Sequence, residues 1–473
     1  MSAISRLVLE ELAAVVGDQW VRTAPAELET YASDATPTKR THPGAVVLPG
    51  SRDEVAAVIK LLHGHRIPVV ARGAGTGLSG GAIAASDAVL LTLTRLNRIL
   101  EVDVANRRAV VETGVVNVRL STEAGRSGLH YAPDPSSQTA CTIGGNIAEN
   151  AGGPHCLKYG VTTNHILELE VVLPDGTVTT LGSPGGEPWG PDLVGLFVGS
   201  EGMFGVATLA TVRLTPVPSA VRTLLADFAG LRDAGEAVSA IIKSGIVPAA
   251  LEMMDHNCIA AVEASIYAAG YPTDAGAVLL VEVDGQHDAP LVSEASEIEA
   301  ILRAHGARSI RSATDEETRT RLWHGRKKAF GAMGRIDRDL VVQDTVVPRS
   351  ALPDVLEQVE RIGREFGINV SNVFHAGDGN LHPNISFNAE DRSQVERVEE
   401  AEAAIVDVCV KVGGTITGEH GVGLEKIKHM ERIFDRVTLE AMRSVQRVFD
   451  PCGLANPGKV LPEPARSEGI SRQ

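Results

Sequence analysis

The sequence predicts an α+β fold with two domains, followed by a C-terminal helical segment. Its 473 residues suffice for two or three domains of ordinary size. Between residues 44 and 217, short apolar runs alternate with glycine-rich turns, a pattern typical of strands joined by loops. From about residue 221 to 425, helical patterns alternate with strands. The change of pattern at Pro216-Val217-Pro218 marks the boundary between the two predicted domains.

Individual elements have clear local signals. Ser51 with Glu54 three residues later is a capping-box signature, so a helix is expected to begin after Ser51. Four apolar runs in the first domain predict strands, at residues 67–71, 88–93, 108–113 and 167–173. In the second domain we expect helices near 231–244 and 351–367, with a strand at 277–283.

These patterns divide the chain into five parts. We expect an N-terminal helical segment at 1–40, a first domain at 41–219, a second domain at 220–425, a C-terminal helical segment at 426–462 that returns to the first domain, and a disordered tail at 463–473. The sequence contains no evident internal repeat.

Composition narrows the classes of function. With 44 Lys and Arg against 60 Asp and Glu, the formal net charge is −16, which argues against nucleic acid as a partner. The five cysteines form no Cys-x-x-Cys pair, so no iron–sulfur cluster is expected within the chain. No apolar run approaches the ~20 residues that cross a bilayer. We therefore expect a cytoplasmic protein that meets a membrane only through partners, and leave a homodimer open.

Clustered glycines indicate that backbone lies against a ligand. Glycine accounts for 48 of the 473 residues, about a tenth, where roughly 7% is usual. The first cluster, residues 72–82, has the spacing G-x-G-x-x-G at Gly75, Gly77 and Gly80. Too few residues separate it from the next strand for the helix of a Rossmann dinucleotide site. We expect this loop to bind phosphate or pyrophosphate through backbone N–H groups, with a plain tight turn as the alternative.

Two further clusters, residues 133–153 and 199–206, imply an extended cofactor. At these three loops the chain resembles the FAD-binding domain of the vanillyl-alcohol oxidase/p-cresol methylhydroxylase superfamily. The resemblance implies a two-part FAD-binding domain and a ferredoxin-like α+β cap domain that binds substrate. Where covalent members carry a tethering histidine, this chain has Thr76, so non-covalent FAD is expected. The implied cofactor contacts are Arg72, Gly73, Ala74, Gly75, Thr76, Gly77, Pro133, Asp134, Ser137, Thr139, Thr142, Gly144, Gly145, Asn146, Gly153, Gly199, Glu201, Gly202, Gly205, Val206 and Asn456.

Residues 372–384 contain two histidines that a hairpin would bring together. Asp378-Gly379 is a strong signal for a type I′ turn, and a two-residue loop there places His375 directly opposite His382. Asn384 would share their face of the sheet. Two paired imidazoles suit a divalent metal, whereas the alternative for each histidine alone is a structural hydrogen bond.

A third ligand is available in residues 414–421, where glycines flank Glu419 and His420. Together the His-x-Gly-Asp-Gly-Asn-x-His and Gly-Glu-His-Gly motifs resemble those of the FAD-linked D-2-hydroxyacid dehydrogenases, a group that includes glycolate oxidase catalytic subunits. The resemblance extends over residues 20–462. It implies His375, His382 and Glu419 as metal ligands, His420 as the general base and Asn384 as a contact of the substrate or metal environment.

The identity of the substrate depends on two further segments. Residues 323–329 resemble a family segment whose arginine binds the substrate carboxylate, a role that falls on Arg326. A solvated basic helix face is the alternative. D-2-hydroxyglutarate dehydrogenases carry a lysine in the strand before an Asp-x-x-x-Pro motif, but residues 341–348 contain this motif without a lysine. Glycolate or D-lactate is therefore favoured, with D-2-hydroxyglutarate as the alternative.

The predicted reaction is oxidation of a D-2-hydroxy acid to the 2-oxo acid. A divalent metal, zinc by preference with iron or manganese open, would acidify the hydroxyl, and flavin would accept the hydride. Lacking nicotinamide, haem and iron–sulfur motifs, the chain needs an external acceptor such as a quinone, a cytochrome or an electron-transfer flavoprotein. The rivals are a non-redox metallohydrolase, a nicotinamide-dependent dehydrogenase and a non-redox flavin synthase.

Overall fold

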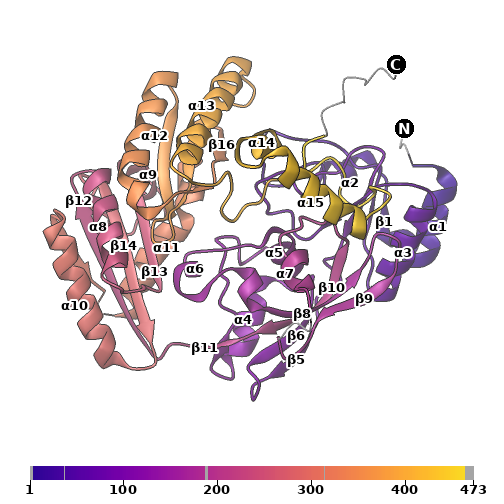
Figure 1. Cartoon of the computed structure of the whole chain (residues 1–473), viewed down its shortest axis with the longest axis horizontal. Coiled ribbons are helices and arrows are strands. Elements are labelled where there is room, and N and C mark those ends of the chain that lie inside the picture. Colours follow the sequence, from indigo (N-terminus) through magenta and orange to yellow (C-terminus); the bar gives the residue numbers. More distant parts are fainter. Residues whose placement is uncertain (1–3, 37, 187–189, 314, 464–473) are drawn as a thin grey trace.

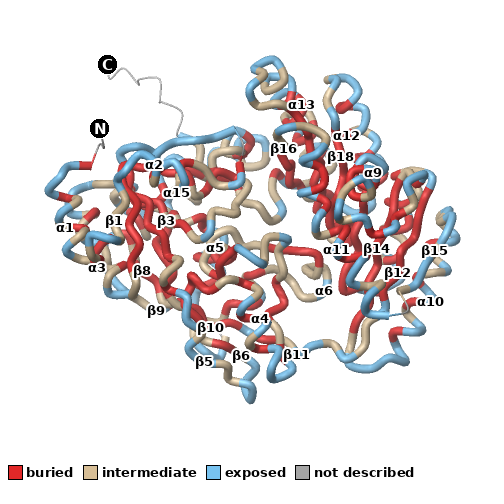
Figure 2. The backbone as a smooth tube through the Cα atoms, turned by 180° about the vertical axis from the view of Figure 1, so that it is seen from behind, coloured by how far each residue is buried: buried red, intermediate tan, exposed pale blue. Residues whose placement is uncertain are grey.

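The computed structural model describes residues 4–36, 38–186, 190–313 and 315–463. Apart from Glu463, the tail predicted at 463–473 therefore lies outside the described residues. The chain forms two halves that lie side by side, joined by the segment between β11 (Thr215–Pro216) and β12 (Ala220–Phe228) (Figure 1). Buried segments gather along the strands of both halves (Figure 2).

The first half begins with a mixed four-stranded sheet of order β1-β2-β4-β3. Its strands are β1 (Val21–Arg22), β2 (Ala45–Val47), β4 (Val89–Thr92) and β3 (Val69–Arg72). The helices α1 (Arg6–Val16) and α3 (Arg52–Gly64) share its apolar core. As predicted, α3 begins after Ser51, whose hydroxyl accepts from the N–H of Glu54. The Glu54 carboxylate accepts from the N–H of Gly50, 2.7 Å away.

The same half contains a second, antiparallel sheet of order β5-β6-β10-β8-β9. Its strands are β5 (Ile99–Asp103), β6 (Arg108–Glu112), β10 (Val206–Arg213), β8 (Ile166–Val172) and β9 (Val178–Gly182). The helices α4 (Asn117–Gly125), α5 (Ile143–Glu149) and α7 (Leu193–Phe197) contribute to its core. All four strands expected in this half are present within a residue or two. The first glycine loop joins β3 to β4 without a helix, as expected.

The second half begins with a ferredoxin-like unit, β12–α8–β13–β14–α10–β15, into which α9 is inserted. Its antiparallel strands have the order β15-β12-β14-β13. The elements are α8 (Leu231–Lys243), β13 (Ala250–Asp255), α9 (His256–Glu263), β14 (Ala277–Gly285), α10 (Asp288–Ala304) and β15 (Ser309–Ser312). The helix and strand predicted near 231–244 and at 277–283 are thus confirmed.

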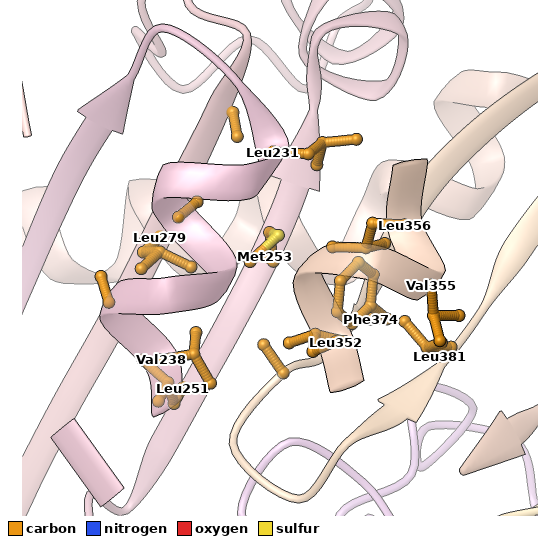
Figure 3. Packing of buried hydrophobic residues seen from close by; sticks show 14 of the residues in the cluster. Leu231, Val238, Leu251, Met253, Leu279, Leu352, Val355, Leu356, Phe374 and Leu381 are labelled. Carbon is orange, nitrogen blue, oxygen red and sulfur yellow. The ribbon is translucent and has the colours of Figure 1, made fainter. Parts of the chain in front are cut away.

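A second set of elements extends this sheet through the pairing of β13 with β18. It consists of α11 (Glu316–Met333), β16 (Asp339–Val342), β17 (Thr345–Val346), α12 (Leu352–Phe366), β18 (Asn369–His375), β19 (Asn380–Leu381), β20 (Pro383–Phe387) and α13 (Arg392–Lys411). Side chains on one face of the strands pack against α8, α10, α12 and α13, and those on the other against α9 and α11. Figure 3 shows Leu352, Val355 and Leu356 of α12 beside Phe374 of β18.

The C-terminal segment returns to the first half. It contains α14 (Met430–Ile433) and α15 (Arg436–Phe449), coloured yellow over the first half in Figure 1. After α15 the chain runs along β3: the N–H of Val69 donates to Leu454, and the N–H of Asn456 donates to Val69. These backbone bonds place Asn456 beside the start of β3, the strand that leads into the first glycine loop.

Candidate active site

The loop between the two motif histidines is longer than predicted. β18 pairs His375 with Asn380, so residues 376–379 form a four-residue turn and the predicted pairing of His375 with His382 is wrong. The N–H of Gly377 donates to Leu251 and that of Val347 to Gly379, and these bonds hold the wider turn. Because the register differs from the prediction by an even number of residues, both imidazoles still share one face. Their ring centroids lie 5.2 Å apart.

Glu419 brings a carboxylate between these two rings. Its Oε1 lies 3.1 Å from Nε2 of His375 and 3.0 Å from Nε2 of His382. Burial would raise the pKa of Glu419, but the two histidines outweigh it and hold this pKa well below its ordinary value. Two imidazole nitrogens and one carboxylate oxygen converge on one point, which is the donor set of a divalent transition-metal site. The residues predicted as metal ligands therefore fit such an ion.

Glu252 and Arg326 lie directly behind His375. The Glu252 carboxylate accepts from Nδ1 of His375 at 2.8 Å and also pairs with the Arg326 guanidinium. Arg326 is only 5% exposed, so the alternative of a solvated basic helix face is wrong. Within the described residues, Nε of Arg326 has no hydrogen-bond partner. Burial would raise the pKa of Glu252, but Arg326 and His375 outweigh it and lower this pKa.

Two buried carboxylates hold the loop that carries Glu419. From the second half, Oδ2 of Asp344 accepts from the N–H groups of Gly418, Glu419 and His420, at 2.8, 3.1 and 3.0 Å. From the first half, Glu201 accepts from the N–H groups of residues 422 and 423, at 2.6 and 2.7 Å. The two halves of the molecule therefore fix the position of this loop together. The sequence pointed to Glu201 as a cofactor contact and to Asp344 through the Asp-x-x-x-Pro motif, but it did not predict that either holds this loop.

His420 lies beside the triad formed by His375, His382 and Glu419 but is not part of it. Its ring stacks on His382 at a centroid distance of 4.9 Å, and its Nε2 lies 3.9 Å from Oε1 of Glu419. Burial lowers the pKa of His420 to about 4, although Asp344 acts in the opposite direction. Asn384 is buried, and its amide nitrogen donates to the backbone carbonyls of Ser371 and His382. Its predicted contact with substrate stays a prediction.

The structure brings the three glycine loops together. A Cβ on Gly73 would lie 2.2 Å from Oγ1 of Thr142, so the first loop lies directly against the second. The third loop is tied to α5 of the second by the N–H groups of Gly199 and Glu201. The amide of Asn456 donates to the carbonyls of Gly81 and Glu201. These contacts, of which the Gly73 approach would be blocked by a side chain, pack the three loops assigned to the cofactor into one surface.

Several side chains predicted as cofactor contacts also hold the loops in place. Asp134 binds Nδ1 of His155, and Thr142 caps α5 by accepting from the N–H of Gly145. Asn146 accepts from the amide of Asn117, and Arg72 donates to the carbonyl of Ser33. Their contacts with FAD remain predictions, as do those of the other residues named for this role.

A cluster of charged residues connects the two halves beside the candidate site. His155 lies 2.9 Å from Asp134 of the first half and 3.6 Å from Glu282 of β14, and its ring stacks on Trp323. The short helix α6 (Cys156–Tyr159) follows, and both views place it between the halves (Figures 1 and 2). Burial would lower the pKa of His155, but the two carboxylates raise it to about 10.

This raised pKa predicts a loss of stability at alkaline pH. Protonated His155 stabilises the folded state fully below its ordinary pKa of 6.5, and this contribution is lost as the pH rises toward about 10. The melting temperature of the wild type should therefore fall more between pH 7 and pH 10 than that of His155→Gln. His130→Gln is the control, since burial lowers the pKa of His130 and the ring is neutral over this range. Parallel pH profiles for wild type and His155→Gln would contradict the assignment.

The chain is similar to known proteins over nearly its whole length. Residues 43–182 match the family described as "FAD binding domain", and residues 217–460 match "FAD linked oxidases, C-terminal domain". The chain is 48% identical over 436 residues to the glycolate oxidase subunit GlcD of Escherichia coli (strain K12), covering 92% of this chain and 87% of that protein. It is 34% identical to the D-lactate dehydrogenase of Anaerostipes hadrus, covering 89% and 90% of the two chains.

Solved structures with the same fold have lower sequence identity. p-Cresol methylhydroxylase superposes with a TM-score of 0.80 at 17% identity, covering 96% of both chains. Alkyldihydroxyacetonephosphate synthase gives 0.76 at 20% identity, covering 97% of this chain and 86% of the other. Within the described residues, no helix combines the length and apolar character that crossing a bilayer requires. The chain belongs to the FAD-linked oxidase family, with the two-domain FAD-binding fold of the vanillyl-alcohol oxidase/p-cresol methylhydroxylase type, and it is an FAD-dependent oxidoreductase.

Proposed function

We propose that this enzyme oxidises a small D-2-hydroxy acid, glycolate or D-lactate, with the help of one divalent metal. The observation that carries the metal assignment is the convergence of His375, His382 and Glu419 at 3.0–3.1 Å. The relatives named glycolate oxidase subunit and D-lactate dehydrogenase support the substrate class. Zinc is the preferred ion because it favours two imidazoles and a carboxylate, and iron or manganese would suit the same donors.

Arg326 is assigned as the residue that binds the substrate carboxylate. This buried guanidinium pairs with Glu252 and still has an N–H group to spare, since Nε has no partner among the described residues. A guanidinium can bind a carboxylate through two parallel hydrogen bonds, which fixes the orientation of the acid as well as its position. The second carboxylate of D-2-hydroxyglutarate would need a further cation, and the lysine expected for that role is absent from residues 341–348.

His420 is assigned as the general base that accepts the proton of the substrate hydroxyl. Bound metal would supply positive charge at the substrate hydroxyl, and bound FAD would supply the hydride acceptor. Nε2 of His420 lies 3.9 Å from Glu419, close enough to the triad to reach a hydroxyl held there. The anchors Asp344 and Glu201 keep this ring in place through the backbone of its loop. Reduced cofactor then needs an external acceptor, for which a quinone, a cytochrome or an electron-transfer flavoprotein is proposed.

A panel of 2-hydroxy acids tests the substrate assignment. Purified enzyme with an artificial electron-accepting dye should reduce the dye with glycolate or D-lactate, and far less with L-lactate or D-2-hydroxyglutarate. A preference for D-2-hydroxyglutarate over both small acids would contradict the assignment. Dye reduction by none of these acids, in protein that is yellow from bound flavin, would contradict the proposed reaction as a whole.

We expect FAD to be bound without a covalent tether, because the family resemblance implies that Thr76 stands where covalent members carry the tethering histidine. Acid precipitation of the purified enzyme should release the yellow flavin into the supernatant, where its absorbance identifies FAD. A washed protein pellet that stays yellow would show a covalent bond. Mass spectrometry of its tryptic peptides would then locate the attachment residue.

A further inference from the structure

We propose that Glu252 is a positioning residue that links the candidate metal site to the guanidinium assigned to the substrate carboxylate. The inference rests on the proposed function and adds a residue to the same site. Glu252 is fully buried in β13 and stands directly opposite His375 in the neighbouring strand β18. Side chains at such paired positions have Cβ atoms only ~4.5–5.5 Å apart, so the contact is built into the sheet.

The first role of Glu252 is to orient His375. Its two carboxylate oxygens lie 2.8 and 3.0 Å from Nδ1 of His375. With Nδ1 donating its proton to Glu252, Nε2 keeps a free lone pair, and Nε2 is the atom that faces Glu419. A carboxylate behind a metal-binding histidine fixes its tautomer, holds its ring and raises its basicity.

The second role of Glu252 is to balance the buried positive charge of Arg326. The guanidinium is buried, and a buried charge without a counter-ion is strongly unfavourable. The ion pair with Glu252 balances this charge and leaves Nε of Arg326 without a partner among the described residues. One carboxylate therefore contacts both groups. Removing its charge should change metal binding and carboxylate binding together, which a residue with only a structural role would not do.

A nearby carboxylate supplies a matched control. Asp255 lies three residues along the same strand and is also buried. It accepts from the N–H of Cys258 and from Asn372, and so caps α9 without touching His375 or Arg326 in these bonds. Asp255→Asn therefore makes the same chemical change in the same strand, away from the proposed site.

The experiment measures Zn²⁺ affinity by competition with a chromogenic chelator, on metal-stripped protein that retains FAD. Glu252→Gln should bind Zn²⁺ roughly 10–100-fold more weakly than wild type, the usual loss when such a partner is removed. Its KM for the preferred hydroxy acid should rise as well, whereas Asp255→Asn should change neither quantity. In Glu252→Gln/Arg326→Gln, part of the Zn²⁺ affinity should return, because the uncompensated guanidinium beside His375 is gone.

The outcomes separate this inference from the proposed function. Wild-type Zn²⁺ affinity in a Glu252→Gln protein with native circular dichroism and bound FAD would overturn the positioning role. Failure of the double variant to recover any affinity would overturn the link to Arg326. If wild-type protein itself binds no Zn²⁺, iron or manganese, the metal site of the proposed function fails instead.

Discussion

Replacing His375 and His382 by alanine together should remove the divalent metal and abolish dehydrogenation, while FAD stays bound. The two imidazoles are two of the three donors of the triad and His382 also belongs to the neighbouring donor group with Asp344 and His420, so both groups lose the ligand number that holds a transition metal tightly. The glycine loops assigned to FAD belong to the first half of the molecule, so cofactor content should be unaffected. Elemental analysis should find about one metal ion per wild-type chain and almost none in the variant.

A matched control removes two imidazoles from the same half of the molecule. His256 and His305 each contact a backbone carbonyl through Nδ1, at 3.1 and 2.9 Å, and neither belongs to the triad. His256→Ala/His305→Ala should therefore retain metal and most of the activity. Full turnover by wild-type enzyme from which all metal has been stripped would exclude a metal role in the reaction, even if the triad binds ions.

Local sequence signals predicted the elements but not the contacts between distant residues. Ser51 gave the start of α3 because a capping interaction spans only three residues. The predicted partner of His375 was wrong by two residues, because backbone bonds to Leu251 and Val347 hold a wider turn. Sequence spacing does not reveal that these two residues lie near the turn. The two histidines nevertheless share a face, since alternation along strands tolerates an even shift.

The residues that sequence analysis missed have partners far away along the chain. Glu252 lies 123 positions from His375, and Asp344 lies 74 positions or more from the backbone groups that it binds. Glu252 belongs to no motif named above, whereas Asp344 is the first residue of the Asp-x-x-x-Pro motif, which was considered only for its missing lysine. For Glu252 the available signal was a carboxylate within an apolar run, residues 250–255, where an ionised group is costly unless it is paired. A charged residue inside a predicted buried strand is therefore a sign of a site.

His420 and Arg326 should divide the work of catalysis and binding, and their variants should separate kcat from KM. Arg326 would hold the acid in the ground state and the transition state alike, so Arg326→Lys should mainly raise KM. Losing the bidentate contact corresponds to about 1.5–3 kcal/mol, or roughly 10–150-fold. Lysine is preferred to alanine here, because alanine would leave Glu252 buried without its ion-pair partner.

His420→Ala should instead lower kcat by about 10²–10⁴-fold with little change in KM, because a general base acts only as the proton moves. Neutral imidazole is the active form, so wild-type activity should fall at acid pH. The pH–activity profile of His420→Ala should lack this acid limb. Burial lowers the pKa of His420, and this limb should therefore lie below the ordinary histidine value. His429→Ala is the control, since burial also lowers the pKa of His429 to about 4 but His429 lies outside the triad. If His420→Ala keeps near-normal turnover and the acid limb, another group accepts the hydroxyl proton, and His420 serves only to pack against His382.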